Sequence, residues 1–212
     1  MIRVENAGYT YPKSAAPALD GFSAVFQRGE IVAVTGKNGC GKTTLTKLLV
    51  GVLRPNIGSV SIDGADTGGM DLFEIGQRAG YVFQNPDAQL FCDTVYNEIA
   101  FGLRNLGLDE TQVQRETSRY LELFELSRCS GIYPGKLSLG EKQRLVLAAV
   151  LALGTDYLVL DEPTTGLDKR RQRELGEMLA KLRKERDCGV ILVSHEDDFI
   201  KCYTDRELVM DS

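Results

Sequence analysis

The sequence predicts an α/β fold built on a mostly parallel sheet. Three short runs are apolar throughout, which is typical of strands that are buried on both faces of such a sheet. Stretches with apolar residues at helical spacing separate these runs, and buried strands that alternate with helices define the α/β class. The three runs are Ile31–Val34, Tyr157–Leu160 and Gly189–Val193.

The N-terminal part of the chain is expected to form short strands and turns. Ile2–Val4 and Leu19–Phe26 are strand candidates, and the second of them ends at turn residues 28–30. The first buried run is followed by a glycine-rich loop and then by leucines at helical spacing, which stop at the helix breaker Gly51. A strand, a tight loop and a helix in this order form the first half of a βαβ unit.

Helical patterns dominate the middle of the chain. Short strands are expected at 60–62 and 81–83, and helical spacing then runs from about residue 93 to 129. A helix that is apolar on nearly every face, and is therefore buried, follows Gly140. We interpret the stretch from about 85 to 153 as a helical subdomain inserted into the α/β core, so that residues 1–212 form a single domain.

Composition excludes several classes of protein. The chain of 212 residues is 43% hydrophobic and 26% charged, which is ordinary for a folded protein and excludes intrinsic disorder. Its net charge of −5 argues against binding nucleic acid through the phosphate backbone. The basic residues of the charged segment 169–186 are interleaved with acids, as on a solvated helix face, so they do not change this prediction.

The sequence also indicates where the protein works. Its longest apolar run, Leu145–Leu153, is nine residues, whereas a membrane-spanning helix needs about 20. The N-terminal residues show no secretory signal. Five scattered cysteines without a Cys-x-x-Cys pair favour reduced thiols, so we expect a cytoplasmic protein.

One glycine-rich segment predicts a nucleotide site. It fits Gly-x-x-x-x-Gly-Lys-[Ser/Thr], in which the backbone N–H groups and the following helix N-terminus face phosphate oxygens. Lys42 can neutralise β- and γ-phosphate charge, and the Thr43 hydroxyl can bind magnesium. The alternative is a glycine turn that matches by chance, which the flanking strand and helix disfavour. The candidate nucleotide-binding residues are Gly36, Lys37, Asn38, Gly39, Cys40, Gly41, Lys42, Thr43 and Thr44.

Two acids end the second buried run. Asp161 and Glu162 lie at the carboxyl edge of the predicted sheet, where ligands bind in open α/β folds. Asp161 can hold a magnesium ion through water, and Glu162 can act as a general base on the attacking water. The alternative is that both acids simply begin a loop before Pro163.

The chain resembles the nucleotide-binding subunit of an ABC transporter along nearly its whole length. The resemblance rests on the phosphate loop and the acid pair together with Gln84, Leu137–Arg144, Gly166–Asp168 and Ser194–His195, in that family's order and spacing. Further segments resemble the ATPases of energy-coupling factor (ECF) importers for vitamins and transition metals. These segments are Tyr9–Pro12, Val82–Phe91 and Asn97–Gly102.

This resemblance implies a fold, an activity and partners. The fold would be a P-loop NTPase core with an N-terminal antiparallel β-subdomain and an inserted α-helical subdomain. The activity would be hydrolysis of ATP with Mg²⁺, coupling head-to-tail dimer closure to uptake of a vitamin or metal ion. The partners would be a second ABC ATPase subunit, identical or related, and integral membrane subunits that hold the protein at the cytoplasmic face of the membrane.

The resemblance also implies roles for single residues. Gln84 would contact magnesium or the attacking water, and His195 would contact the γ-phosphate and that water. Tyr11 would stack on adenine. The alternatives are an exposed aromatic before Pro12, and a lone histidine satisfied at a strand end. The implied catalytic set is Glu162, His195, Gln84 and Lys42, and the metal set is Thr43, Gln84 and Asp161.

The segment Ser138, Leu139, Gly140, Glu141 corresponds to the family's signature, which contacts the nucleotide of the partner subunit. Ser138 followed by Glu141 is a capping-box pattern that opens the buried helix. The family's usual signature is Leu-Ser-Gly-Gly-Gln, so Leu139 replaces a glycine and Glu141 replaces a glutamine. We expect this added negative charge to reduce activity at the partner's site. Asp168 is expected to cap the charged helix.

Two alternative functions remain open at this stage. One is an ATPase of another ABC importer or of an exporter. The other is a soluble ABC-type switch that does not transport. Such switches usually carry two cassettes or a long coiled-coil insertion, whereas here residues 85–137, 53 residues, separate Gln84 from Ser138.

Overall fold

The computed structural model describes residues 1–210, and the chain forms two compact units. The core unit comprises Met1–Tyr81 and the chain from Asp156 onward, and the helical unit comprises Val82–Thr155. The helical subdomain expected at about 85–153 falls within the helical unit. The predicted α/β class with a mostly parallel sheet is confirmed by the strand pairing of the core unit.

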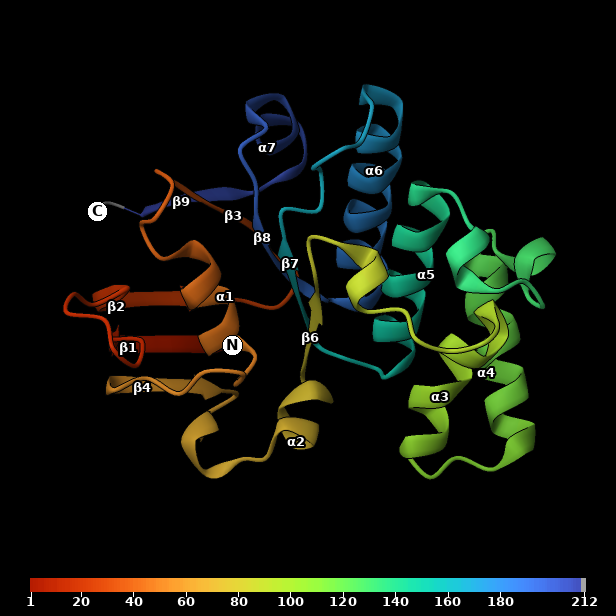
Figure 1. The fold of residues 1–212 in the computed structure, drawn as a ribbon, viewed down its shortest axis with the longest axis horizontal. Coiled ribbons are helices and arrows are strands. Elements are labelled where there is room, and N and C mark those ends of the chain that lie inside the picture. The colour runs from red at the N-terminus through yellow and green to blue at the C-terminus, as the bar shows by residue number, and fades with distance from the viewer. Residues whose placement is uncertain (211–212) are drawn as a thin grey trace. The chain divides into compact units, whose positions relative to one another are not determined.

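The core unit contains two sheets. The smaller sheet has the strand order β2-β1-β4-β5 with antiparallel pairing, which confirms the expected antiparallel N-terminal region. The larger sheet has the order β6-β7-β8-β3-β9, in which β7, β8, β3 and β9 pair in parallel. The strands (Figure 1) are β1 (Ile2–Tyr9), β2 (Leu19–Phe26), β3 (Ile31–Gly36), β4 (Ile57–Ile62), β5 (Ala65–Asp66), β6 (Ala79–Val82), β7 (Tyr157–Asp161), β8 (Gly189–Val193) and β9 (Arg206–Met210).

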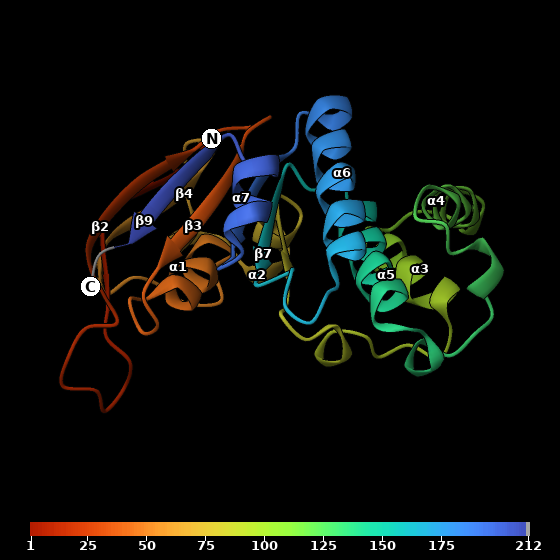
Figure 2. The same ribbon diagram turned by 90° about the horizontal axis from the view of Figure 1, so that it is seen from above.

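Helices cover both faces of the larger sheet. Val32 and Val34 of β3 share one core cluster with leucines of α1 and with side chains of the smaller sheet. Ile31 and Ala33 are equally buried and alternate with them, so they face the opposite side, where α6 contacts β3 and β8. Figure 2 shows α6 and α7, which pack against each other. The helices of this unit are α1 (Lys42–Leu49), α2 (Leu72–Gly76), α6 (Lys169–Arg186) and α7 (Asp197–Tyr203).

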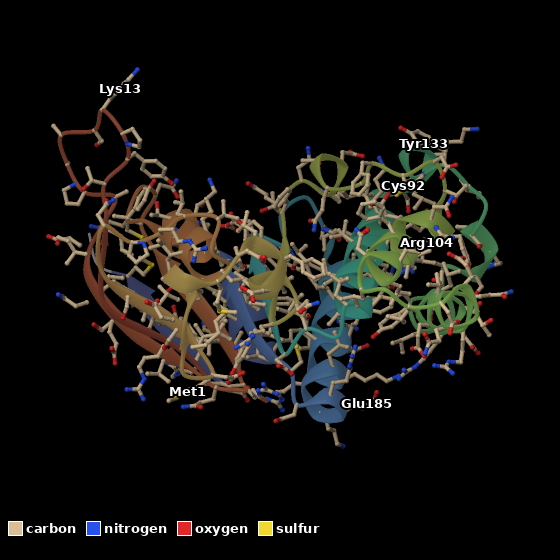
Figure 3. All side chains as sticks on the ribbon, turned by 90° about the horizontal axis from the view of Figure 1, so that it is seen from below. Met1, Lys13, Cys92, Arg104, Tyr133 and Glu185 are labelled. Atoms are coloured by element: carbon tan, nitrogen blue, oxygen red, sulfur yellow. The ribbon has the colours of Figure 1, made fainter. Side chains whose placement is uncertain are left out.

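The helical unit packs three helices against one another. They are α3 (Val95–Asn105), α4 (Glu110–Leu123) and α5 (Leu139–Ala152). The Tyr120 hydroxyl of α4 donates a hydrogen bond of 2.8 Å to the Leu151 carbonyl of α5. The buried Glu98 carboxylate accepts from the backbone N–H groups of Phe91 and Cys92, at 3.1 and 2.7 Å (Cys92 is labelled in Figure 3). Glu98 therefore fixes the loop that leads into α3.

Several predicted boundaries differ from the structure. Strand β1 extends to Tyr9, well beyond the expected 2–4, and β6 ends at Val82 rather than at Phe83. The Phe83 N–H donates to the Gln89 side chain at 3.1 Å. The two short helices α2 and α7 were not predicted from the sequence. Within residues 1–210, none of the helices combines the length and the apolar character needed to cross a bilayer.

Candidate nucleotide site

The loop between β3 and α1 needs glycine at both glycine positions of the motif, 36 and 41. Gly36, Gly39 and Gly41 have φ values of 142°, 86° and 98°, a region that favours glycine. A Cβ atom on Gly41 would lie 2.3 Å from the Ala18 carbonyl oxygen, and one on Gly36 would lie 2.5 Å from the Met210 carbonyl oxygen. The loop is therefore held closely against neighbouring backbone.

The N-terminus of α1 has no side-chain cap. Its N-cap residue is Gly41, no side chain accepts from the first turn, and that turn contains no acid. The first N–H groups of a helix have no partner within the helix and carry a partial positive charge. A loop of this kind followed by such a helix end binds phosphate groups in many proteins.

Lys42 points into the loop that precedes it. Its side chain is buried, with a residue exposure of 7%, and Nζ donates to the carbonyl oxygens of Gly36 (2.7 Å) and Lys37 (3.0 Å). The Cys40 Sγ lies 4.0 Å from the same Nζ. The ammonium group is thus placed inside the loop by neutral acceptors, and an anionic phosphate oxygen would be a stronger one. Lys37, Asn38 and Gly39 form the exposed rim of the loop.

Asp161, the last residue of β7, is connected to the first turn of α1. The Tyr81 hydroxyl donates to Asp161 Oδ2 at 2.9 Å and lies 3.3 Å from Thr46 Oγ1. Thr46 Oγ1 in turn donates to the Thr43 carbonyl at 3.0 Å. Thr43 itself is exposed. These contacts link the Asp161 carboxylate to the backbone of the first turn of α1.

Glu162 follows directly and adopts a left-handed backbone conformation with φ of 52°. Its N–H donates to the Val193 carbonyl at 3.0 Å, at the end of the neighbouring strand β8. His195 Nε2 donates to Glu162 Oε1 at 2.9 Å, and the side chains are 49% and 16% exposed respectively. A non-glycine residue in this conformation is uncommon and is often found at functional sites.

Burial raises the pKa of the Glu162 carboxyl above its ordinary value, and the charge of Asp161 adds to this effect. The charges of His195 and Lys42 oppose it. A carboxylate with a raised pKa is a stronger base than an exposed one, and a general base works best when its pKa is near the operating pH. The side chain is therefore suited to accept a proton.

Tyr11 lies on the loop between β1 and β2, whose tip carries Lys13 (Figure 3). Its hydroxyl is 3.3 Å from Thr44 Oγ1, and its ring meets that of Tyr9 edge to face at 4.9 Å. The ring is 37% exposed. Tyr11 is thus anchored beside the phosphate loop with part of its ring facing solvent.

The remaining predicted site residues belong to the helical unit. Gln84 is exposed and follows β6 by two positions. Ser138 is the N-cap of α5, and its capping box with Glu141 is confirmed. Glu141 Oε2 accepts from both the Ser138 N–H (2.8 Å) and the Ser138 hydroxyl (2.6 Å). These hydrogen bonds hold the pKa of the Glu141 carboxyl below its ordinary value.

A family model described as "ABC transporter" matches residues 19–165, and with them the phosphate loop, the acid pair and the α5 N-terminus. This chain belongs to the ABC transporter family. Its members of this type are ATPases, so the chain is an ATP hydrolase. The predicted resemblance to the family's nucleotide-binding subunit is confirmed.

Relatives and solved structures agree with this assignment. A protein named as an ABC transporter ATP-binding protein of Pyrococcus furiosus is 44% identical over 210 residues, covering 99% of this chain and 80% of the relative. The energy-coupling factor transporter ATP-binding protein EcfA of Methanothermobacter thermautotrophicus is 42% identical, covering 100% and 68%. The structure of CbiO1 from Clostridium perfringens, titled as part of the ABC transporter complex CbiONQ, matches with a TM-score of 0.89 at 32% identity, covering 99% and 84%. Three other curated relatives are much longer, and this chain spans only 34–36% of their length.

The donor set of this ABC ATPase suits magnesium, which the family generally uses with ATP. Thr43 and Asp161 offer hard oxygen atoms, which Mg²⁺ prefers. Across residues 1–210, three or more His, Cys, Asp or Glu side chains do not gather into a metal-binding group.

The structure adds contacts that the sequence did not indicate. Tyr81 and Thr46 connect Asp161 to the first turn of α1, and the buried Thr164 and Ser194 hydroxyls lie 3.0 Å apart beside the Glu162–His195 pair. Each link joins residues that are distant in sequence, so only the strand order of the sheet brings them together. The expected cap of α6 is confirmed, because Asp168 accepts from the Arg171 N–H at 2.8 Å.

Proposed function

We propose that this ATPase powers an ECF-type importer, in which closure of a head-to-tail dimer on MgATP drives uptake of a vitamin or metal ion through a separate membrane subunit. The observation that carries the proposal is the half-buried Glu162 carboxylate, which His195 contacts and on which the charge of the phosphate-loop Lys42 acts. The similarity to EcfA and CbiO1 supports the importer class.

The core unit would bind the nucleotide. The loop N–H groups, Lys42, Thr43 and Thr44 would hold the phosphates, and Tyr11 would stack on adenine. Thr43 and Asp161 would hold Mg²⁺, which when bound neutralises phosphate charge. Glu162 would take a proton from the attacking water, and His195 would orient the γ-phosphate and keep Glu162 in place.

The helical unit would act on neighbouring subunits. In a head-to-tail dimer, the segment 138–141 would reach the nucleotide bound by the second ATPase subunit. A membrane subunit would dock on the exposed aromatic pair Phe91 and Phe101, whose rings meet edge to face at 5.0 Å. Phe91 is 67% exposed, and Glu98 fixes the loop that presents it. An exposed aromatic pair on a fixed loop is a typical feature of a protein interface.

Replacing Glu162 with Gln tests the chemistry. We expect Glu162→Gln to bind MgATP with unchanged affinity and to lose turnover by about 100-fold or more, because the amide cannot accept the proton. The raised pKa of Glu162 adds a second readout. Wild-type turnover should fall as the pH is lowered through that pKa, at a higher pH than an ordinary glutamate would give. Phosphate release and nucleotide titration measure these quantities.

Glu185→Gln is the matched control, because Glu185 lies on α6 and is exposed (Figure 3). It should keep full turnover. Near-normal turnover in Glu162→Gln would remove Glu162 from the role of base. Co-purification from detergent extracts tests the transport assignment. A small membrane protein that travels with the ATPase supports it, whereas co-purification with ribosomes would point to a soluble switch.

A further inference from the structure

The Tyr81 hydroxyl occupies a central position between the two residues that would hold Mg²⁺. Strand β6 lies next to β7 in the sheet, so Tyr81 on β6 reaches Asp161 at the end of β7. The same hydroxyl contacts Thr46, and Thr46 donates to the carbonyl of Thr43. Three contacts of 2.9, 3.3 and 3.0 Å therefore link the Asp161 carboxylate to the backbone carbonyl of Thr43.

This geometry restricts Asp161 in two ways. A hydrogen bond to Oδ2 fixes the rotation of the carboxylate, because a donor in the plane of the group prefers one orientation. It also occupies one of the two oxygens, which leaves Oδ1 as the less engaged oxygen for a ligand. Thr46 Oγ1 lies 3.3 Å from the same hydroxyl, so Tyr81 contacts both this carboxylate and helix α1.

We propose that Tyr81 is a positioning residue that sets the affinity of the nucleotide site for Mg²⁺ by fixing Asp161 relative to Thr43. The inference rests on the proposed function, since it assumes that Asp161 and Thr43 serve the nucleotide-bound ion. Groups that orient metal ligands typically change metal affinity by 10- to 100-fold when they are removed. Tyr81 acts through Asp161 and Thr46 and needs no contact with the nucleotide.

The ring of Tyr81 also packs against the hydrophobic core, so a purely structural role is the competing explanation. Tyr81→Phe separates the two, because it removes the hydroxyl and keeps the ring. Tyr120→Phe is the matched control, because it removes a tyrosine hydroxyl that donates to a backbone carbonyl within the helical unit. Thr46→Val is a second variant that breaks the same chain of contacts from the α1 side.

The experiment measures binding of a fluorescent ATP analogue to the full chain while Mg²⁺ is titrated, and again in excess EDTA. We expect Tyr81→Phe to raise the Mg²⁺ concentration at half-saturation about tenfold and to leave metal-free nucleotide affinity unchanged. Thr46→Val should shift the Mg²⁺ dependence in the same direction, and Tyr120→Phe should not. Melting temperatures recorded alongside show whether each variant is folded.

The outcomes separate the two proposals. An unchanged Mg²⁺ dependence in Tyr81→Phe, or an equal loss of affinity with and without Mg²⁺, would overturn the positioning role and leave the proposed function standing. If Tyr81→Phe does not fold, Thr46→Val decides by the same criterion. A wild-type chain that binds no nucleotide under either condition would instead overturn the proposed function, and the inference about Tyr81 with it.

Discussion

The N-termini of helices α1 and α5 both lie at predicted nucleotide-binding motifs, but they differ in how they are capped. Helix α1 starts after Gly41 without a side-chain cap and without an acid in its first turn. Helix α5 starts at Ser138 with a complete capping box and with Glu141 in its first turn. The first helix leaves its N–H groups available to an external anion, whereas the second supplies its own carboxylate.

The difference shows that a helix can leave its N-terminal N–H groups uncapped, so that an external anion can bind them. An N-cap side chain is worth about 1 kcal/mol, so α1 forgoes a stabilising contact that α5 keeps. Packing compensates for this, because the leucines of α1 are fully buried in the core cluster. A phosphate group that binds there would add stability by mass action, since it binds only the folded chain.

The largest expected effect is a loss of ATP affinity on replacing Lys42, the first residue of α1. Lys42→Met should weaken ATP binding by about 100-fold or more, because a charge-assisted contact with the phosphates is lost from a buried position. Isothermal titration calorimetry measures the affinity. Lys37→Met is the control, because it removes an exposed ammonium from the same loop. We expect it to change the affinity less than about threefold. Equal losses in both variants would show that only the net charge of the loop matters.

A smaller effect tests whether the α5 N-terminus does more than begin a helix. Ser138→Ala should cost about 1 kcal/mol of unfolding free energy and should also lower ATPase activity about tenfold. Asp109→Ala removes an equivalent capping box from α4 in the same unit. It should cost the same stability and leave activity unchanged. Urea unfolding and phosphate release measure the two quantities, and equal losses of activity would reduce Ser138 to a structural cap.

The smallest expected effect is a change in turnover on replacing Glu141, the acid in the first turn of α5. Glu141→Gln removes the carboxylate that accepts from both the N–H and the hydroxyl of Ser138. We expect activity to rise about two- to fivefold, because a partner's phosphate no longer meets a negative charge at this helix end. Stability should fall by about 0.5 kcal/mol through loss of the favourable charge at the N-terminus. Turnover that falls, or does not change, would contradict the idea that Glu141 limits the signature segment.

Local signals in the sequence were sufficient for much of this site. The glycines of the phosphate loop, the acids at the end of β7 and the cap of α5 each follow from residues a few positions apart. The contact between Tyr81 and Asp161 could not be predicted in this way, because it depends on β6 lying next to β7 in the sheet. The left-handed backbone conformation of Glu162 could not be predicted either, because glutamate rarely adopts it.

Short helices and the exposure of single apolar residues were also difficult to predict from the sequence. Helix α2 has only five residues, too few for a helical period to show, although Asp71 and Glu74 form the capping box that a search for caps could have found. In the aromatic segment of the helical unit, the sequence did not distinguish Val95, which is fully buried, from Phe91, which is largely exposed. Both are apolar, and only the packing of α3 decides between them.

The segments that directly follow β7 and β8 are joined by three contacts. The Glu162 N–H is bonded to the Val193 carbonyl, the Thr164 and Ser194 hydroxyls meet in the interior, and the His195 ring holds the Glu162 carboxylate. These three contacts join the segment that follows β7 to the segment that follows β8, and they hold the Glu162 carboxylate next to the His195 imidazole. Under the proposed function, a shift of either segment would therefore be passed on to both side chains.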